Sequence, residues 1–138
     1  MRSLIKLSAC QRFKRTTGKV VIFGAVLVFG GCGGSTDSRP AKWSFIAPTI
    51  VEPSCATVNC HSAITAKAAV DLHDCQTGYY TLRNRNFVIP GDSSESEIVS
   101  LMNAQGATRM PPDAPLNAAD IALIERWIDL GALDDCDD

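Results

Sequence analysis

The sequence predicts a small all-α domain. Its clearest helix begins after Asn117, a good N-cap residue, with Asp120 in the first turn and Gly131 at the end of the pattern. Four apolar residues recur along it at helical spacing: Ile121, Ile124, Trp127 and Ile128. No segment of the chain has a convincing strand pattern, and no internal repeat is present.

Two helices are expected earlier in the chain. Trp43 to Val51 carries apolar groups and has Pro48 in a position that suits a first helical turn. The alanine-rich stretch from Ser62 to Ala69 favours a second helix, which we expect to begin near Cys60. Tyr79 to Ile89 has no clear period, so we expect an irregular segment there.

A further helix is predicted after the turn signal Pro90-Gly91. Asp92 to Glu95 reads as a capping box, with an N-cap acceptor followed three residues later by a carboxylate. We therefore expect this helix to start at Ser93 and to end by Gly106. Its apolar face would consist of Ile98, Val99, Leu101 and Met102.

Residues 1–31 have the pattern of a bacterial export signal. The first 19 residues hold six basic side chains and no acidic one, and the apolar run Val20 to Phe29 then leads to Cys32. This run is well below the roughly 20 residues that span a bilayer, so we expect a cleaved signal peptide. Small residues before Cys32 resemble a lipobox, which predicts lipidation at Cys32; secretion with this cysteine unmodified is the alternative.

The expected organisation is a signal peptide (1–31), a flexible linker (32–42) and a folded domain (43–138). Without residues 1–31 the chain keeps seven of its 13 Lys and Arg residues and all 15 Asp and Glu residues, a net charge of −8. Such an acidic domain is unsuited to nucleic acid, whose phosphates require a basic surface. We expect it in the bacterial cell envelope, on the periplasmic side and attached to a membrane through Cys32.

The segment Cys55 to His61 contains the groups of a covalent haem site. The thiols of Cys55 and Cys60 can add to the vinyl groups of a haem, and the adjacent imidazole of His61 can bind the iron as proximal ligand. The usual motif has two residues between its cysteines, whereas this chain has four. Because residues five apart do not share a helix face, we expect Cys55 in a turn at Pro53-Ser54, before the helix that carries His61.

Met110 is the predicted distal ligand of the iron. Its thioether is followed by Pro111 and Pro112, whose fixed φ angles limit the motion of the loop. A gap-filling role in the core is the alternative for Met110, with Met102 as a substitute thioether. His73 is an alternative that would give two imidazole ligands.

Other side chains are expected around the haem. Five apolar residues would bury it: Phe45, Ile50, Phe87, Ile98 and Trp127. Three arginines could pair with its propionates, because a guanidinium binds a carboxylate through two hydrogen bonds: Arg83, Arg85 and Arg109.

The remaining cysteines form a pair. With Cys32 lipidated and Cys55 and Cys60 bound to haem, Cys75 and Cys136 are left, and an exported protein can keep them as a disulfide. The alternative is a disulfide between Cys55 and Cys60 with no haem.

The chain from Phe45 to Ala132 resembles the small c-type cytochrome domains of bacterial lipoproteins, including the planctomycete-type family. The matching landmarks, in order, are the Cys55 to His61 segment, Val70-Asp71-Leu72, Pro90-Gly91-Asp92 with Ser96, Arg109-Met110-Pro111-Pro112, and Trp127 to Ala132. The resemblance implies a cytochrome c-like fold, with N- and C-terminal helices packed around a covalently bound haem c.

These observations predict an exported monohaem c-type cytochrome that carries single electrons to and from redox partner proteins in the cell envelope. Because His61 and Met110 would fill both axial positions of the iron, we expect an electron carrier and not an enzyme. Three alternatives remain. They are a zinc site of Cys55, Cys60, His61 and either His73 or Cys75, a small haem peroxidase with an open distal position, and a structural lipoprotein held by disulfides.

Overall fold

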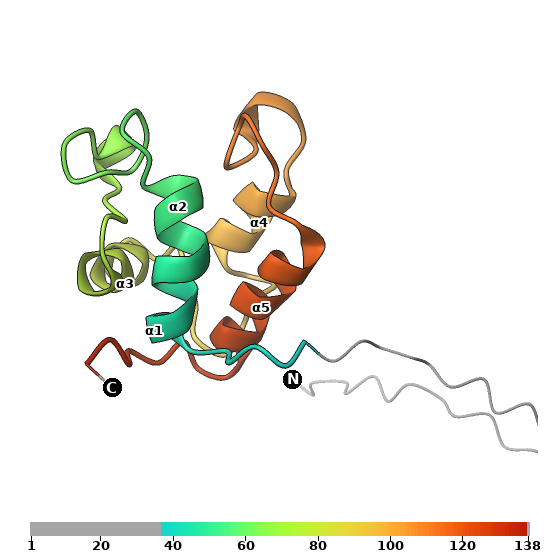
Figure 1. The fold of residues 1–138 in the computed structure, drawn as a ribbon. Helices are drawn as coiled ribbons and strands as arrows, with labels where there is room; N and C mark the ends of the chain where they lie inside the picture. Colours follow the sequence, from blue (N-terminus) through green and yellow to red (C-terminus); the bar gives the residue numbers. More distant parts are fainter. Residues whose placement is uncertain (1–36, 138) are drawn as a thin grey trace, which may run out of the picture. The chain divides into compact units, whose positions relative to one another are not determined.

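The computed structural model describes residues 37–137, which belong to one compact unit bounded by Ser35 and Asp138. These residues form helices, turns and loops without any strand, which confirms the predicted all-α class (Figure 1). No helix within 37–137 has both the length and the apolar character needed to cross a membrane. The expected signal peptide, residues 1–31, and the lipidation at Cys32 lie outside the described residues.

The first helical stretch runs unbroken from Trp43 to Cys55. It consists of α1 (Trp43–Ile46), the π-helical turn η1 (Ala47–Val51) and α2 (Glu52–Cys55), and the residues at both junctions keep right-handed helical φ and ψ angles. The Glu52 N–H bonds to the Ala47 carbonyl five residues back, the spacing of a π-helix. Pro48 and Pro53 lie at the starts of η1 and α2.

The turn expected at Pro53-Ser54 is therefore wrong, and Cys55 is the last residue of a helix. A proline interrupts a helix chiefly by lacking the N–H that bonds to the preceding turn. Here each proline lies in the first turn of a new hydrogen-bonding pattern, where this N–H is not needed.

The helix expected through Ser62 to Ala69 is also wrong. Residues 58–65 form successive turns and a bend, followed by the short 3₁₀ turn η2 (Lys67–Ala69). The backbone N–H of Lys67 reaches back to the Cys60 carbonyl, and that of Leu72 bonds to the His61 carbonyl at 2.8 Å. These long-range pairings override the helix preference of alanine, which amounts to less than about 1 kcal/mol per residue.

The irregular segment expected at Tyr79 to Ile89 is instead helical over most of its length. Helix α3 (Cys75–Asn84) is capped by Asp74, whose carboxylate accepts from the Thr77 N–H at 2.8 Å. Gly78 and Leu82 are buried four residues apart on one face. Segment 85–89 then leads out of the helix without regular structure.

Helix α4 (Glu97–Asn103) begins four residues later than expected, with Ser96 as its N-cap residue. Asp92 does accept from the Glu95 N–H at 3.1 Å, but this bond closes a turn before the helix. Ser96 is fully buried, and its hydroxyl accepts from the Ile89 N–H and donates to the Asp92 carbonyl. Burial of Ser96 thus holds segment 89–96 in a turn and moves the helix start to Glu97.

Helix α5 (Ala118–Asp129) confirms the prediction for the last helix. The Asn117 side chain caps it by accepting from the Asp120 N–H at 2.9 Å, and Gly131 follows its end with φ +106°. Its buried residues are Leu123, Ile124, Trp127 and Ile128. A short 3₁₀ turn, η3 (Gly106–Thr108), lies in the long loop between α4 and α5.

Two stacked indoles form the centre of the core. The ring centroids of Trp43 and Trp127 are 4.7 Å apart, and each indole N–H donates to a carbonyl, of Cys75 and Leu133 respectively. Helices α3 and α5 both contact α1, and Figure 1 shows them on either side of it. This packing leaves loop 56–69 and the loop after α4 at the same end of the helices (Figure 1).

Both ends of the described chain are attached to the helices. A disulfide joins Cys75, at the start of α3, to Cys136. At the other end Arg39 pairs with Asp120, and Arg126 donates to the backbone carbonyls of Asp37 and Arg39. Residues 37–39, which the sequence assigns to the linker, therefore lie along α5.

Candidate cofactor site

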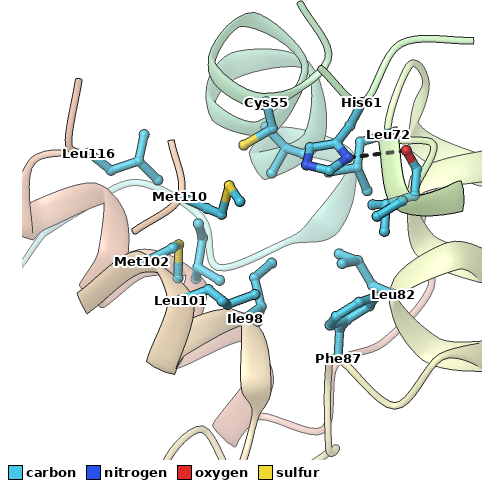
Figure 2. Close-up of a pocket in the computed structure, with 14 residues that line it drawn as sticks. Cys55, His61, Leu72, Leu82, Phe87, Ile98, Leu101, Met102, Met110 and Leu116 are labelled. Carbon is cyan, nitrogen blue, oxygen red and sulfur yellow. Dashed lines mark hydrogen bonds between the residues drawn. The ribbon is translucent and has the colours of Figure 1, made fainter. Parts of the chain in front are cut away.

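An apolar cavity of about 230 Å³ lies at the end of the molecule where the two loops meet. Figure 2 shows His61, Leu72, Leu82 and Phe87 on one side of it, and Met110, Met102 and Leu116 on the other. Cys55, at the end of α2, also lines the cavity. Nearly all of the remaining wall is aliphatic.

A second hollow of about 130 Å³ adjoins this cavity. The two share Cys55, His61, Ala68 and Met110 as lining residues, and the hollow adds Cys60, Pro111 and Pro112. The structure therefore gathers at one place the four residues that the sequence assigns to haem, namely Cys55, Cys60, His61 and Met110.

The four-residue spacer folds into a compact turn between the cysteines. The His61 N–H donates to the Cys55 carbonyl at 3.1 Å, and the Cys60 N–H donates to the Thr57 carbonyl at 2.9 Å. The turn returns the chain to the end of α2, while the spacer side chain of Val58 is exposed. Despite the two extra residues in the spacer, the backbone of His61 is therefore hydrogen-bonded directly to that of Cys55.

One nitrogen of the His61 ring is held by the backbone. Nδ1 lies 3.2 Å from the Val70 carbonyl oxygen, the contact drawn as a dashed line in Figure 2. Because a carbonyl oxygen only accepts, Nδ1 carries the proton in this contact. Nε2 then keeps a lone pair, as required of an imidazole that binds a metal.

Cys55 and Cys60 are both free thiols in the structure, so the alternative disulfide between them is not formed. Burial, with a smaller contribution from the neighbouring Cys60, raises the pKa of the Cys55 thiol to about 11. At neutral pH Cys55 is therefore a protonated thiol facing an apolar cavity.

Met110 reaches both hollows from the loop after α4. Its backbone N–H donates to the Leu101 carbonyl at 3.0 Å, and the residue is 36% exposed. Arg109 donates from Nε to the Pro111 carbonyl and from Nη2 to the Pro112 carbonyl, so it closes the loop around Met110. Met102, the substitute thioether, lines the cavity from α4 and is buried.

His73 lies elsewhere, beside two carboxylates. Its Nδ1 is 2.8 Å from Asp71 and its Nε2 is 2.6 Å from Asp74, and it lines neither hollow. Cys75, the other possible fourth zinc ligand, is bonded to Cys136. Within residues 37–137 no three His, Cys, Asp or Glu side chains are grouped as a metal site would require.

The expected surroundings of the haem are found in part. Phe87 and Ile98 line the cavity, whereas Ile50 and Trp127 are buried in the core and Phe45 packs against it. Sequence reasoning missed eight wall residues: Val51, Ala68, Val70, Leu72, Leu82, Leu101, Leu116 and Ile124. For Leu82 no signal stood out in the sequence, because the other buried residue of α3 is Gly78, which has no side chain.

The three arginines expected near the propionates donate to backbone carbonyls. Arg83 bonds to the carbonyl of Val88, and Arg109 to those of Pro111 and Pro112. Arg85 bonds to two carbonyls of the loop beside the cavity, those of Ala68 and Ala69.

Comparison with known proteins finds no family model, no curated protein and no solved structure that matches this chain.

Proposed function

We propose that this domain is an exported monohaem c-type cytochrome with a cytochrome c-like fold, which carries single electrons. In this proposal Cys55 and Cys60 hold haem c through thioether bonds. His61 is the proximal iron ligand and Met110 the distal one.

The observation that carries the proposal is the meeting of these four residues at the apolar cavity and its adjoining hollow: Cys55, His61 and Met110 line both, and Cys60 lines the hollow. They come from the end of α2, the following loop and the loop after α4. Two thiols, an imidazole and a thioether are the groups that c-type haem binding requires. In an ordinary packed core we would not expect these four side chains to be grouped around an unfilled cavity.

The residues present fit a haem in three respects. The cavity and the adjoining hollow together fall at the lower end of the roughly 300–1,000 Å³ of typical small-molecule sites. The lining is apolar and suits a flat macrocycle. The Val70 carbonyl selects the His61 tautomer that leaves Nε2 free to bind iron.

When bound, the haem supplies an iron that gains and loses one electron. His61 and Met110 would both bind the iron in this proposal, and a haem held by both would supply electron transfer and not oxygen or peroxide chemistry. The aliphatic walls from Leu82, Leu101 and Leu116 would keep water away from the haem and disfavour its more highly charged oxidised state, which would raise the reduction potential.

The proposal places the domain in the bacterial cell envelope. Residues 1–31 would direct export to the periplasmic side, and a lipid at Cys32 would attach the protein to a membrane. Its partners would be redox proteins of the envelope. The charge of −8 after residue 31 favours a partner with a basic face over any nucleic acid.

Two methionine variants test the ligand assignment. In Met110→Ala we expect the haem to stay covalently attached while its spectrum becomes high-spin and cyanide binds, because the distal ligand is lost. Met102→Ala is the matched control, since Met102 lines the same cavity from α4. It should remain low-spin and lose about 2–5 kcal/mol of unfolding free energy, as expected for a truncated buried methionine.

A low-spin spectrum unchanged in Met110→Ala would remove Met110 from the iron. A high-spin spectrum in Met102→Ala alone would transfer the role to Met102.

A further inference from the structure

The loop beside the cavity has an unusual backbone. Ala66, Ala68 and Ala69 have φ values of 37°, 56° and 57°, all in the left-handed region. For an L-residue other than glycine this conformation costs about 1–2 kcal/mol each. Contacts from outside the loop must therefore hold it in place, and Ala68 lines both hollows.

Arg85 supplies such a contact from the end of α3. Its Nη1 donates to the carbonyl of Ala68 at 3.0 Å and to that of Ala69 at 2.8 Å. The guanidinium also lies over the ring of Phe87, 5.5 Å from its centroid, and Phe87 is a wall of the cavity. Arg85 thus connects the end of α3 with the loop 66–69 and with the cavity wall at Phe87.

The loop leads directly to the carbonyl that holds His61. Val70 follows Ala69, and its carbonyl oxygen is the partner of His61 Nδ1. The Val70 N–H donates to the Lys67 carbonyl, so a backbone hydrogen bond closes the turn 67–70. Because Val70 follows Ala69 directly, the hydrogen bonds that hold the Ala68 and Ala69 carbonyls to Arg85 also hold the Val70 carbonyl in place relative to the imidazole of His61.

We propose that Arg85 is a positioning residue for His61, acting through the loop 66–69 and the Val70 carbonyl. For its effect on electron transfer the inference rests on the proposed function. For its effect on the imidazole itself it does not, because the hydrogen bond is present in the haem-free chain.

Loss of the hydrogen bonds from Arg85 to the loop 66–69 should have two measurable consequences. The hydrogen bond to Val70 makes the imidazole a stronger electron donor, which favours oxidised iron. A weaker bond therefore raises the reduction potential of the loaded protein. It also exposes the Nδ1 proton, whose exchange with solvent should accelerate roughly three- to tenfold, the ratio that corresponds to one ordinary hydrogen bond.

The experiment compares Arg85→Ala and Arg85→Lys with Arg83→Ala in the exported protein. Arg83 is the matched control, because it lies two residues away and also donates to a backbone carbonyl, that of Val88. We measure the His61 Nδ1 proton by ¹⁵N-resolved NMR and, where haem is attached, the reduction potential. Arg85→Ala should show faster exchange of the Nδ1 proton and a higher reduction potential than the wild type. In Arg85→Lys both quantities should return most of the way to their wild-type values, and Arg83→Ala should change neither.

Equal exchange and potential in Arg85→Ala and the wild type would overturn the inference, as would equal changes in Arg83→Ala. If Arg85→Ala does not fold, Arg85→Gln, which keeps the aliphatic stem over Phe87, takes its place. If the exported chain carries no haem, the proposed function fails. The His61 tautomer of the haem-free protein then still decides the role of Arg85, since the Nδ1–H form should be less populated in Arg85→Ala.

Discussion

His73 is an exposed histidine between two carboxylates. Both of its ring nitrogens lie within hydrogen-bonding distance of an acid, Asp71 at 2.8 Å and Asp74 at 2.6 Å. Only the protonated ring can donate from both nitrogens. The hydrogen bond to Asp71, helped by the charges of Asp74 and Glu52, raises the pKa of His73 above its ordinary value of 6.5.

This raised pKa predicts a pH dependence of stability. A pKa that is higher in the folded state means that His73 contributes its full stabilisation below pH 6.5 and loses it as the pH rises through the folded value. Unfolding free energies of wild type and His73→Gln, measured with urea between about pH 5.5 and about pH 8.5, should therefore converge toward alkaline pH. A difference that is constant across this range, or that grows with pH, would contradict the assignment.

His73 also shows why a residue type is not a site. A histidine 12 residues after His61 was a reasonable alternative ligand by chemistry alone. Its neighbours Asp71 and Asp74 determine its role instead, because they engage both nitrogens outside the cavity. The acidic residues that flank it in sequence carried this information.

Helices α1 and α3 approach each other closely at Gly78. A Cβ atom placed on Gly78 would lie 3.3 Å from Cζ2 of Trp43 and 3.7 Å from Cα of Leu72. The absence of a side chain thus permits the indole to stack on Trp127 while α3 packs against it.

Gly78→Val is expected to destabilise the domain by about 1–3 kcal/mol, because its methyl groups overpack this contact. Gly78→Ala is the graded control. Its single methyl needs only a small shift of Trp43, and the gain in helix preference of about 0.5–1 kcal/mol offsets that cost. Urea unfolding measures both, and a Gly78→Val variant as stable as Gly78→Ala would show that the contact is not tight.

The sequence predicted a helix correctly where all of its signals come from residues close together in the chain. Helix α5 was predictable because a side-chain cap, a helical apolar period and a final glycine agree. The loop 56–69 was not, because alanine favours a helix and only long-range contacts, including those of Arg85, hold it otherwise. The start of α4 was missed because the same Asp92 cap can close a turn or begin a helix.

The candidate site was also predictable from the sequence only in part. Its chemically distinctive members, Cys55, Cys60, His61 and Met110, could be named from the sequence because thiol, imidazole and thioether groups are few. Its walls could not, because leucines line cores and cofactor cavities alike. Leu82, Leu101 and Leu116 acquire their place from the packing of α3, α4 and the loop before α5.

The domain as a whole combines a packed core with a cavity at the end where loop 56–69 meets the loop after α4. Its core residues pack α1, α3 and α5 together, and the disulfide Cys75–Cys136 closes a segment of 61 residues. In the chain-entropy description such a crosslink contributes on the order of 4 kcal/mol.

The covalent attachment of haem is measured most directly by the intact mass of the protein together with its pyridine haemochrome spectrum. The full chain is exported in a host with a cytochrome c maturation system, beside a known c-type cytochrome as a control. We predict one haem that survives denaturation in the wild type, and none in the Cys55→Ala, Cys60→Ala double variant. Mature protein without haem, in cells where the control cytochrome is fully loaded, would contradict the account.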